Sequence, residues 1–505
     1  MTGKHRDRHI VHRVTASART RLLRLGAALL AACSGAALVV ACSTNPATGQ
    51  RQLSLVGEGQ EIAMGREADP QIVAQFGLYP DEGLQRYVSD IGQALARASE
   101  RPDLPWTFRV LDDPLVNAFA LPGGFIYITR GILAHLDSEA ELAGVLGHEI
   151  GHVTARHSAS QMSKGMLAQI GLVAGAVLAP EAAQDYGGLA QAAAGLMFLK
   201  FGRDDERQAD ALGVRYASRE GYDPNALLGV FDTLDRVSQA AGGGMPGWAS
   251  THPAPEDRSQ RISALISELG SELPSDLRRE REPYLRRLDG LVYGDDPRQG
   301  FFDASTFYHP ELAFELRFPD GWATQNTRNA VMALHPQRVA MVQLTLANAP
   351  SASDAASRFY GQEAVVAGQR WNDPVAGLRS VGGSFGVRDA SGQIPIEGFA
   401  VFAEHGGRVY QLLGYARSNA FGGVSNALRS SLSSMRQLRD QRILAAQPLR
   451  LDVMQLDRRR TLAQVAQGSP VSVEALGMMN RVSPDGTLEP GSWIKVVRGT
   501  LPMGR

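Results

Sequence analysis

The clearest helical pattern in the chain begins at Ser138. Ser138 and Glu141 have the S-x-x-E spacing of a capping box, in which the serine hydroxyl accepts a backbone N–H and the glutamate reaches back. Apolar residues then recur at helical spacing, namely Leu142, Val145, Leu146, Ile150 and Val153. The pattern predicts a helix with one buried face from Ser138 to about Val153.

Strand patterns lie before and after this helix. Phe125–Arg130, introduced by Pro122-Gly123-Gly124, is rich in β-branched and aromatic residues and predicts a strand. From about residue 301 more strands are expected, at Leu312–Phe318, Met341–Leu346, Phe399–Phe402 and Val409–Leu413. Helical stretches at Ser351–Gly361 and Gly423–Leu438 accompany them. The second half therefore predicts an antiparallel α+β domain over residues 301–440, of unknown role.

The first 42 residues follow a different pattern. Residues 1–24 carry seven Lys or Arg and one Asp, and Leu25–Val40 is an uncharged apolar run of about 16 residues, which is short of the roughly 20 needed to span a bilayer. A basic segment followed by such a run is typical of a secretory signal. An uncleaved membrane anchor is the alternative. Both indicate an exported protein, with a periplasm as the expected compartment.

Both cysteines of the chain, Cys33 and Cys42, lie in this region, and each follows small apolar residues, as in the lipobox of bacterial lipoproteins. We favour Cys42 as the lipidated residue, because the polar stretch Ser43–Pro46 after it begins a tether. The resemblance implies a membrane anchor through a lipid on Cys42. Ser43 in the next position implies sorting to the outer membrane.

Charge and cysteine content narrow the chemistry of the remaining chain. The net charge of the whole is −1, and because residues 1–24 carry +6, the chain from Ser43 onward carries −7. An acidic body argues against nucleic-acid binding, since no cationic field is left for phosphates. With no cysteine after Cys42, any metal must be held by His, Asp and Glu.

The predicted helix carries such residues in His148-Glu149-Ile150-Gly151-His152. Two histidines four residues apart project from one helix face and can bind one Zn²⁺. Glu149 is then placed to act as general base toward a water molecule at the metal. The alternative is a chance HExxH on a helix surface, which the cap and the matching apolar phase disfavour.

A catalytic zinc site needs a third protein ligand, and Arg203–Gly213 offers one. Ala209, Leu212 and Ala217 can pack this segment as a second helix on the first. Glu206 would ligate the metal, and Asp210, one turn on, would accept the N–H of a ligating imidazole. The alternative is a solvated charged face with i,i+4 pairs.

Several motifs in order resemble the HtpX/CAAX prenyl protease-like zinc metallopeptidases, gluzincins with HExxH followed by ExxxD, and among them the soluble periplasmic BepA-type branch. The motifs are Asn117–Gly124, Gly147–Val153, Glu206–Asp210, Gly221–Pro224 and Ser250–Pro253, with Cys42–Gly49 at the start. The resemblance covers about residues 43–285. It implies a mainly α zincin-like fold with a small edge sheet, one zinc ion per chain and endopeptidase activity.

The resemblance also suggests roles for single residues. It supports His148, His152 and Glu206 as ligands and Glu149 as the base. It also supports Asp210 as the residue that hydrogen-bonds a ligating imidazole. His252 matches a family histidine in the cleft, which either stabilises the transition state or occupies the free position of the metal; both readings stay open. Arg258 is expected to anchor the His252 loop to an acid. His135 and His157 are expected to make local hydrogen bonds rather than to ligate.

Substrate binding is expected beside the first strand. If Phe125–Thr129 lies at a sheet edge over the metal, an extended polypeptide can add to it through main-chain hydrogen bonds, next to Phe125 and Tyr127. Asn117 is expected either to bind substrate backbone or only to hold its own turn. The apolar segment Ile170–Ala179 is too short to span a membrane, and we interpret it as a lid or a helix over the cleft.

The last part of the chain, residues 445–505, resembles a LysM module with βααβ order, and peptidoglycan would then be a further partner. It departs from the module at Arg458-Arg459-Arg460, where Gly-Asp is usual before Thr-Leu. A small packing domain without glycan affinity is the alternative. A charged stretch at 286–300 is expected to be a linker.

The sequence thus predicts a multi-domain protein with a signal peptide (1–42), a zinc metalloprotease domain (43–285), a linker, an α+β domain and a LysM-like domain. The expected function is a zinc endopeptidase that hydrolyses unfolded or misassembled envelope proteins. The alternative is a chaperone-like envelope scaffold with a latent or inactive protease site.

Overall fold

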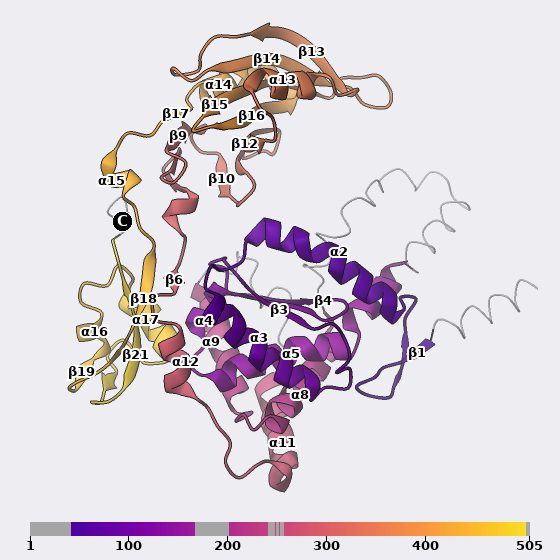
Figure 1. Ribbon diagram of the computed structural model, residues 1–505, viewed down its shortest axis with the longest axis vertical. Helices are drawn as coiled ribbons and strands as arrows, with labels where there is room; N and C mark the ends of the chain where they lie inside the picture. Colours follow the sequence, from indigo (N-terminus) through magenta and orange to yellow (C-terminus); the bar gives the residue numbers. More distant parts are fainter. Residues whose placement is uncertain (1–41, 167–200, 241–247, 249–251, 253–256, 501–505) are drawn as a thin grey trace, which may run out of the picture.

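The computed structural model describes residues 42–166, 201–240, 248, 252 and 257–500. A helical amino-terminal region with a small sheet is followed by a large antiparallel-sheet region (Figure 1). The expected signal at Leu25–Val40, Cys33 and the apolar segment Ile170–Ala179 lie outside the described residues. Within the described ranges, every helix is too short or too polar to cross a bilayer.

The small sheet has three strands in the order β3-β5-β4, with β5 parallel to β3 and antiparallel to β4. The strands are β3 (Thr107–Leu111), β4 (Ala118–Leu121) and β5 (Phe125–Thr129). The predicted strand at Phe125–Thr129 is present, but the prediction that it forms a sheet edge is wrong. Because β5 is bonded on both sides, its main chain cannot receive a substrate strand, and β3 and β4 are the outer strands.

Helices cover both faces of this sheet. Helix α2 (Glu58–Phe76) packs Ala68 and Ile72 on one face, against Phe119 and Tyr127. Helices α3 (Glu82–Arg97) and α5 (Glu139–Thr154) pack on the other face within the main hydrophobic core. A short helix, α4 (Arg130–His135), connects β5 to α5. The sheet is therefore buried between two layers of helices. Helix α5 packs on one face of it, next to β4.

The predicted start of α5 is confirmed in part. The Ser138 hydroxyl accepts the N–H of Glu141 at 3.3 Å, as expected for an N-cap. The Glu141 carboxylate, however, accepts the N–H of Asp137 rather than that of Ser138. The side chains of Ser138 and Glu141 thus satisfy two backbone donors, the N–H groups of Glu141 and Asp137, at the start of α5.

Helix α8 (Arg203–Arg219) crosses α5 at very short range. A Cβ on Gly213 of α8 would lie 2.9 Å from the backbone nitrogen of His148, and one on Gly151 of α5 would lie 3.1 Å from Cα of Ala209. Ala209, Leu212 and Ala217 are buried, as the sequence predicts. Small residues at the crossing let side chains from both helices meet. Helices α9 (Ala226–Ala240) and α11 (Arg258–Leu269) complete this region.

The second region contains a seven-stranded antiparallel sheet in the order β10-β11-β12-β16-β15-β14-β13. Its strands are Ala323–Asn326, Val331–Leu334, Ala340–Ala347, Arg408–Arg417, Ile396–His405, Ser380–Val387 and Val365–Trp371 in that order. Along β15, Phe399 and Val401 share a core with α14 (Ser418–Leu432), whereas Ala400 and Phe402 share one with α13 (Ala352–Tyr360). The two helices thus cover opposite faces. The expected antiparallel α+β domain is confirmed in outline.

A four-stranded antiparallel sheet in the order β17-β9-β8-β7 borders this domain. Its strands are Arg436–Gln437, Phe314–Arg317, Thr306–His309 and Phe301–Asp303 in that order. Phe314 and Leu316 of β9 belong to the same core as α14. The four-stranded sheet therefore closes one side of the α+β domain.

The expected linker at 286–300 is not a free connection. After α12 (Arg281–Arg287), strand β6 (Val292–Tyr293) pairs with β18 (Leu449–Gln455), and Leu288 and Leu291 are buried in the core of the first region. The charged residues of this stretch interrupt its apolar positions, so the sequence pattern does not indicate that Leu288 and Leu291 are buried. From β6 the chain continues into the α+β domain. After that domain it returns as β18, which pairs with β6 (Figure 1).

The last segment follows a strand–helix–helix–strand order. Its main elements are β18, α16 (Leu462–Val465), α17 (Val473–Asn480) and β21 (Trp493–Arg498), and β18 pairs antiparallel with β21. The short strands β19 (Arg460–Thr461) and β20 (Thr487–Leu488) pair with each other. We call residues 445–500 the carboxy-terminal module. Its apolar residues belong to the same core as α3 and α5, so it packs directly on the first region.

Candidate metal centre

Helix α5 presents His148 and His152 on one face, as their spacing predicts. Both side chains are buried, and their Nε2 atoms lie 3.0 Å apart. A buried imidazole pair at this distance needs either a shared proton or a cation between the two nitrogens. The pair thus forms one side of a small polar centre in the apolar core.

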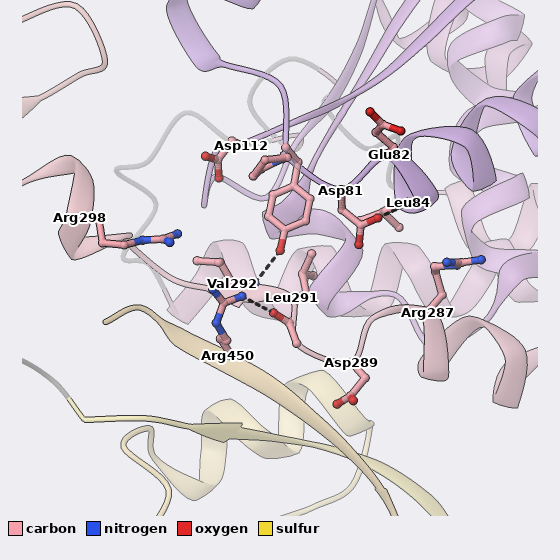
Figure 2. Close-up of a pocket in the computed structure, with 13 residues that line it drawn as sticks. Asp81, Glu82, Leu84, Asp112, Arg287, Asp289, Leu291, Val292, Arg298 and Arg450 are labelled. Carbon is pink, nitrogen blue, oxygen red and sulfur yellow. Dashed lines mark hydrogen bonds between the residues drawn. The ribbon is translucent and has the colours of Figure 1, made fainter. Parts of the chain in front are cut away.

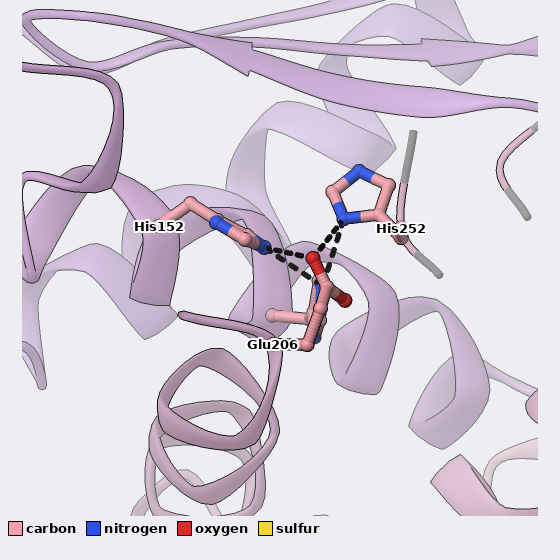
Figure 3. Close-up of side chains that lie close together, drawn as sticks. His152, Glu206 and His252 are labelled. Carbon is pink, nitrogen blue, oxygen red and sulfur yellow. Dashed lines mark hydrogen bonds and ion pairs between the residues drawn. The ribbon is translucent and has the colours of Figure 1, made fainter. Parts of the chain in front are cut away.

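Glu206 enters the same centre from α8. Its carboxylate oxygens lie 3.6 Å from Nε2 of His148 and 3.5 Å from Nε2 of His152. His252 completes the group, with Nδ1 3.0 Å from Oε1 of Glu206 and 3.3 Å from Nε2 of His148 (Figure 3). One donor atom from each of these four residues lies within 4.8 Å of the others.

The second nitrogen of His148 has the partner that the sequence suggested. Oδ1 of Asp210 lies 3.0 Å from Nδ1 of His148. Arg258 donates to both oxygens of Asp210 at 2.8 and 2.6 Å and lies 3.4 Å from Oε2 of Glu206. Because a carboxylate can only accept here, Nδ1 of His148 carries the proton and Nε2 offers a lone pair to the centre.

The arrangement fits a metal ion. Two imidazole nitrogens and a carboxylate oxygen are the donors that Zn²⁺ prefers, and three such ligands are usual in a catalytic site. The lone pair of His148 Nε2 points at the neighbouring histidine and at a carboxylate, a repulsive set that a divalent cation would neutralise. The residues His148, His152 and Glu206 would hold the ion, with His252 at the fourth position.

Glu149 lies beside this group rather than in it. Its Oε1 accepts the indole N–H of Trp248 at 3.1 Å and lies 3.6 Å from Nε2 of His252. In the described part of the chain its Oε2 is buried without a hydrogen-bond partner. A buried, half-satisfied carboxylate next to a cation site has a free lone pair for a reacting water.

Burial dominates the electrostatics of the centre. It raises the pKa of Glu149, and it raises the pKa of Glu206 to about 7 against the opposing charges of His148 and Arg258. Burial likewise lowers the pKa of His152 and brings that of His252 to about 3, so both imidazoles are neutral. For Asp210, burial is outweighed by the His148 hydrogen bond and by Arg258, and its pKa is lowered. Neutral imidazoles and an ionised Asp210 are the forms that metal binding requires.

Three contacts of the centre were not singled out by the sequence analysis. Phe201 packs its ring 4.0 Å from the ring of His152, Trp248 bonds Glu149, and Gln208 contacts His157 at 3.1 Å. Gln208 lies inside the Glu206–Asp210 motif, which is the one local signal that could have indicated it. Trp248 and Phe201 have no such signal, because only the fold brings them to α5.

The flanking histidines differ from each other. Nδ1 of His157 lies 3.0 Å from Nδ1 of His152, so His157 makes the local hydrogen bonds that the sequence predicts. Nδ1 of His135 is buried with no partner among the described residues. In the part of the chain that the structure describes, His135 therefore makes no hydrogen bond through Nδ1, and it lies outside the group of possible metal donors, as expected for a residue that does not ligate.

The expected substrate-binding residues lie near the sheet rather than at the metal. Phe125 and Tyr127 are buried under α2, and the Tyr127 hydroxyl donates to Asp69 at 2.8 Å, so neither side chain is open to a substrate. The prediction for these two residues is wrong because β5 is the central strand. Asn117 precedes the outer strand β4, and its buried Oδ1 has no partner in the described part of the chain.

A separate pocket of about 450 Å³ lies where α3, the β6 connection and β18 meet (Figure 2). Its charged groups are largely engaged: Arg298 bonds Asp296, and Arg450 donates to the carbonyl of Gly290. None of the metal-centre residues lines it. The pocket is thus a junction between parts of the chain and not the reaction site.

Two histidines one helical turn apart, a glutamate from a second helix and an intervening glutamate base define a zincin-type metallopeptidase centre. Comparison with known proteins agrees. Residues 82–266 match the family model of Peptidase family M48, and we call this matched part of the chain the M48 domain. The match contains α5, α8, His252 and Arg258.

Relatives in three organisms carry similar stretches. The chain is 36% identical over 186 residues to the putative beta-barrel assembly-enhancing protease of Vibrio cholerae, covering 35% of this chain and 38% of that protein. It is 29% identical over 215 residues to the mitochondrial metalloendopeptidase OMA1 of Arabidopsis thaliana (42% and 41% covered). It is 27% identical over 251 residues to the metalloprotease YcaL of Escherichia coli (47% and 96% covered).

The chain thus spans about two fifths of the first two relatives and nearly all of the third. The family match and these relatives support a metalloendopeptidase, and the donor set supports zinc as its metal. Both agree with the enzyme class and the cofactor expected from the sequence.

Proposed function

We propose that the protein is a zinc endopeptidase of the bacterial envelope that hydrolyses unfolded or misassembled envelope proteins. The observation that carries the proposal is the convergence of His148, His152 and Glu206 from two helices, beside Oε2 of Glu149, which has no hydrogen-bond partner among the described residues. One relative is named a beta-barrel assembly-enhancing protease, which supports envelope proteins as clients.

In the proposed reaction, His148, His152 and Glu206 would hold the zinc ion, which when bound would supply Lewis-acid polarisation of the scissile carbonyl. Glu149 takes a proton from the attacking water through Oε2 and later delivers it to the leaving amine. The Trp248 N–H fixes Oε1, so the carboxylate keeps one orientation through both proton transfers. Asp210 and Arg258 hold His148 in its metal-binding tautomer.

We place the substrate polypeptide along β4 instead of β5. Strand β4 has one strand neighbour in the described part of the chain, so its other edge can accept an extended peptide. The carbonyl of Val116, just before β4, accepts the backbone N–H of Trp248, which ties this edge to the Glu149 side of the centre. Oδ1 of Asn117, unpaired within the described ranges, is then positioned to accept a substrate N–H.

Lipidation of Cys42 and attachment to the outer membrane complete the proposal. Cys42 begins strand β1 (Cys42–Thr44), which pairs with β2 (Arg51–Leu53) in a hairpin that packs on the M48 domain. A lipid on Cys42 would hold the domain close to the membrane surface. The carboxy-terminal module is a candidate for peptidoglycan binding, with its strand–helix–helix–strand order in support.

The test of the proposed mechanism is Glu149→Gln. The variant should bind one zinc ion per chain, because Glu149 is not a ligand, and should lose at least about 100-fold in the rate of cleaving an unfolded protein, because the proton acceptor is gone. The matched control is Glu268→Gln at an exposed site on α11. Cleavage by Glu149→Gln at the control rate would refute the proposed mechanism.

A second candidate is a chaperone-like scaffold with a latent protease site. The position of His252 favours it, because Nδ1 of His252 lies within the ligand group and would fill the place that a substrate carbonyl needs. His252→Ala separates the candidates. A latent enzyme should cleave faster without the imidazole, a catalytic His252 should leave cleavage slower, and a scaffold should show no cleavage in either form.

A further inference from the structure

The amino-terminal hairpin places one polar side chain next to the metal centre. Asn45, in the turn between β1 and β2, is 3% exposed. Its Oδ1 accepts two backbone N–H groups, those of Ala47 at 2.9 Å and Thr48 at 3.3 Å. Because backbone N–H groups can only donate, they fix which end of the Asn45 amide is the oxygen.

The amide nitrogen of Asn45 therefore points the other way, toward the metal helices. Its Nδ2 lies 3.1 Å from the carbonyl of Ala155 at the end of α5, 3.2 Å from Oε1 of Gln52 and 3.4 Å from Oε1 of Gln208 on α8. The amide can only donate to these atoms. Its two hydrogens serve three acceptors, of which Gln208 is the longest contact, and this arrangement favours the oxygen of Gln208 over its nitrogen on this side.

The side-chain oxygen of Gln208 also faces His157. Oε1 of Gln208 lies 3.1 Å from Nε2 of His157, so that this nitrogen carries the proton. The proton is then absent from Nδ1 of His157, which lies 3.0 Å from Nδ1 of His152. His152 must donate there, and its Nε2 is left with a free lone pair directed at His148 and Glu206.

We propose that Asn45 is a positioning residue of the metal centre, which sets the metal-binding tautomer of His152 through Gln208 and His157. The proposal rests on the proposed zinc site and adds to it the hairpin that follows Cys42. Asp210 performs the same task for His148 from the other side. The two histidine ligands of α5 are thus oriented in different ways. His148 is oriented by one carboxylate, and His152 is oriented by a series of three neutral side chains.

A purely structural role for Asn45 is the competing explanation, since it also caps the carbonyl of Ala155. The two roles differ in what they require. Capping needs any donor at this position, whereas tautomer control needs the whole donor–acceptor order from the turn to His152. A substitution that keeps shape but reverses this order separates them.

Asn45→Asp is that substitution. The carboxylate still accepts from Ala47 and Thr48, but its second oxygen is now an acceptor and forces Gln208 to turn its NH₂ toward it and toward His157. His157 then donates from Nδ1, and His152 is protonated at Nε2, where the metal should bind. We expect zinc affinity, measured by competition with a chromogenic chelator on the full chain, to fall roughly 10- to 100-fold.

Gln52→Glu is the matched control. It introduces the same charge into the same hairpin but still offers an acceptor to Nδ2 of Asn45, so zinc affinity should change less than about threefold relative to the wild type. Nitrogen chemical shifts of ¹⁵N-labelled histidines in the metal-free protein read the His152 tautomer directly. They should report protonated Nδ1 in the wild type and in Gln52→Glu, and protonated Nε2 in Asn45→Asp.

Gln208 provides an independent pair if Asn45→Asp does not fold. Gln208→Met removes the acceptor at nearly constant volume and should weaken zinc binding about tenfold, whereas Gln208→Glu keeps it and should restore affinity. Equal zinc affinity of Asn45→Asp and Gln52→Glu, or of the two Gln208 variants, would overturn the proposal. Wild-type zinc binding without cleavage would instead count against the proposed function alone.

Discussion

At the scale of single residues, the interior holds several polar groups whose protonation is fixed by burial. His135, the last residue of α4, is buried next to the buried Lys495 of the carboxy-terminal module. Burial first, and the charge of Lys495 second, lower the pKa of His135 to about 3. Lys495 donates to the carbonyls of Ala134 and Leu136 on either side of it. A neutral His135 is therefore part of the folded state.

This residue should make the protein acid-sensitive. Below the ordinary histidine pKa of about 6.5 the unfolded chain takes up a proton that folded His135 refuses, so stability falls as pH decreases from about 6.5 toward 3. His135→Gln cannot titrate and should remove about 2 kcal/mol of the stability loss between pH 7 and pH 5. Urea unfolding of both proteins across this range measures it, and parallel pH curves would contradict the assignment.

At the scale of elements, the crossing of α5 and α8 decides whether the ligands meet. Gly147 and Gly151 on α5 face Gly213 and Ala209 on α8, and backbone touches backbone where the helices cross. His148 sits directly at this contact, and Glu206 lies two turns before Gly213 on α8. The separation of the helices thus sets the distance from the histidine pair to the carboxylate.

Gly213→Ala tests this dependence. Its Cβ would lie 2.9 Å from the backbone nitrogen of His148, which cannot move without moving α5. We expect a loss of about 1–3 kcal/mol in stability and weaker zinc binding, because the helices must separate. Gly59→Ala in α2, where a Cβ meets nothing within 4 Å, should leave zinc binding unchanged. Unchanged zinc affinity in Gly213→Ala would show that the crossing tolerates the methyl group.

At the scale of the whole molecule, the carboxy-terminal module is bound to the start of the metal helix. Arg481, at the end of α17, donates to both oxygens of Glu141 at 2.5 and 2.6 Å and to Thr233 on α9 at 3.1 Å. The Glu141 side chain is only 4% exposed, so its charge depends on this partner. The module is thereby held on the M48 domain through the first turn of α5.

Arg481→Ala should accordingly destabilise the first region as well as the module. It leaves the Glu141 carboxylate buried without its cation, at a cost of about 3 kcal/mol. The comparison is Arg459→Ala, whose pair with Glu489 is more than 60% exposed on both sides and should contribute less than about 1 kcal/mol. Thermal unfolding of both variants measures the difference, and a module that melts separately with the M48 domain unaffected would contradict the shared core.

The sequence by itself determined helix α5, several strands of the α+β domain and the residues grouped at the metal centre, because these depend on local spacing. A cap at Ser138, an apolar helical period and an i,i+4 histidine pair are properties of a few consecutive residues, and the structure confirms the helix and groups His148, His152 and Glu206. The antiparallel α+β domain followed from the same kind of pattern. Its charged border hid the buried Leu288 and Leu291.

Only the tertiary structure decided which strand is the sheet edge, which side chains surround the ligands and where the last module docks. Strand order depends on pairing between segments, and a buried strand such as β5 looks the same at an edge or in the centre. Asn45 lies 110 residues along the chain from Ala155, and Arg481 lies 340 residues from Glu141. Such polar side chains acquire their partners only once packing has excluded water. Local sequence patterns therefore do not indicate contacts between residues so far apart along the chain.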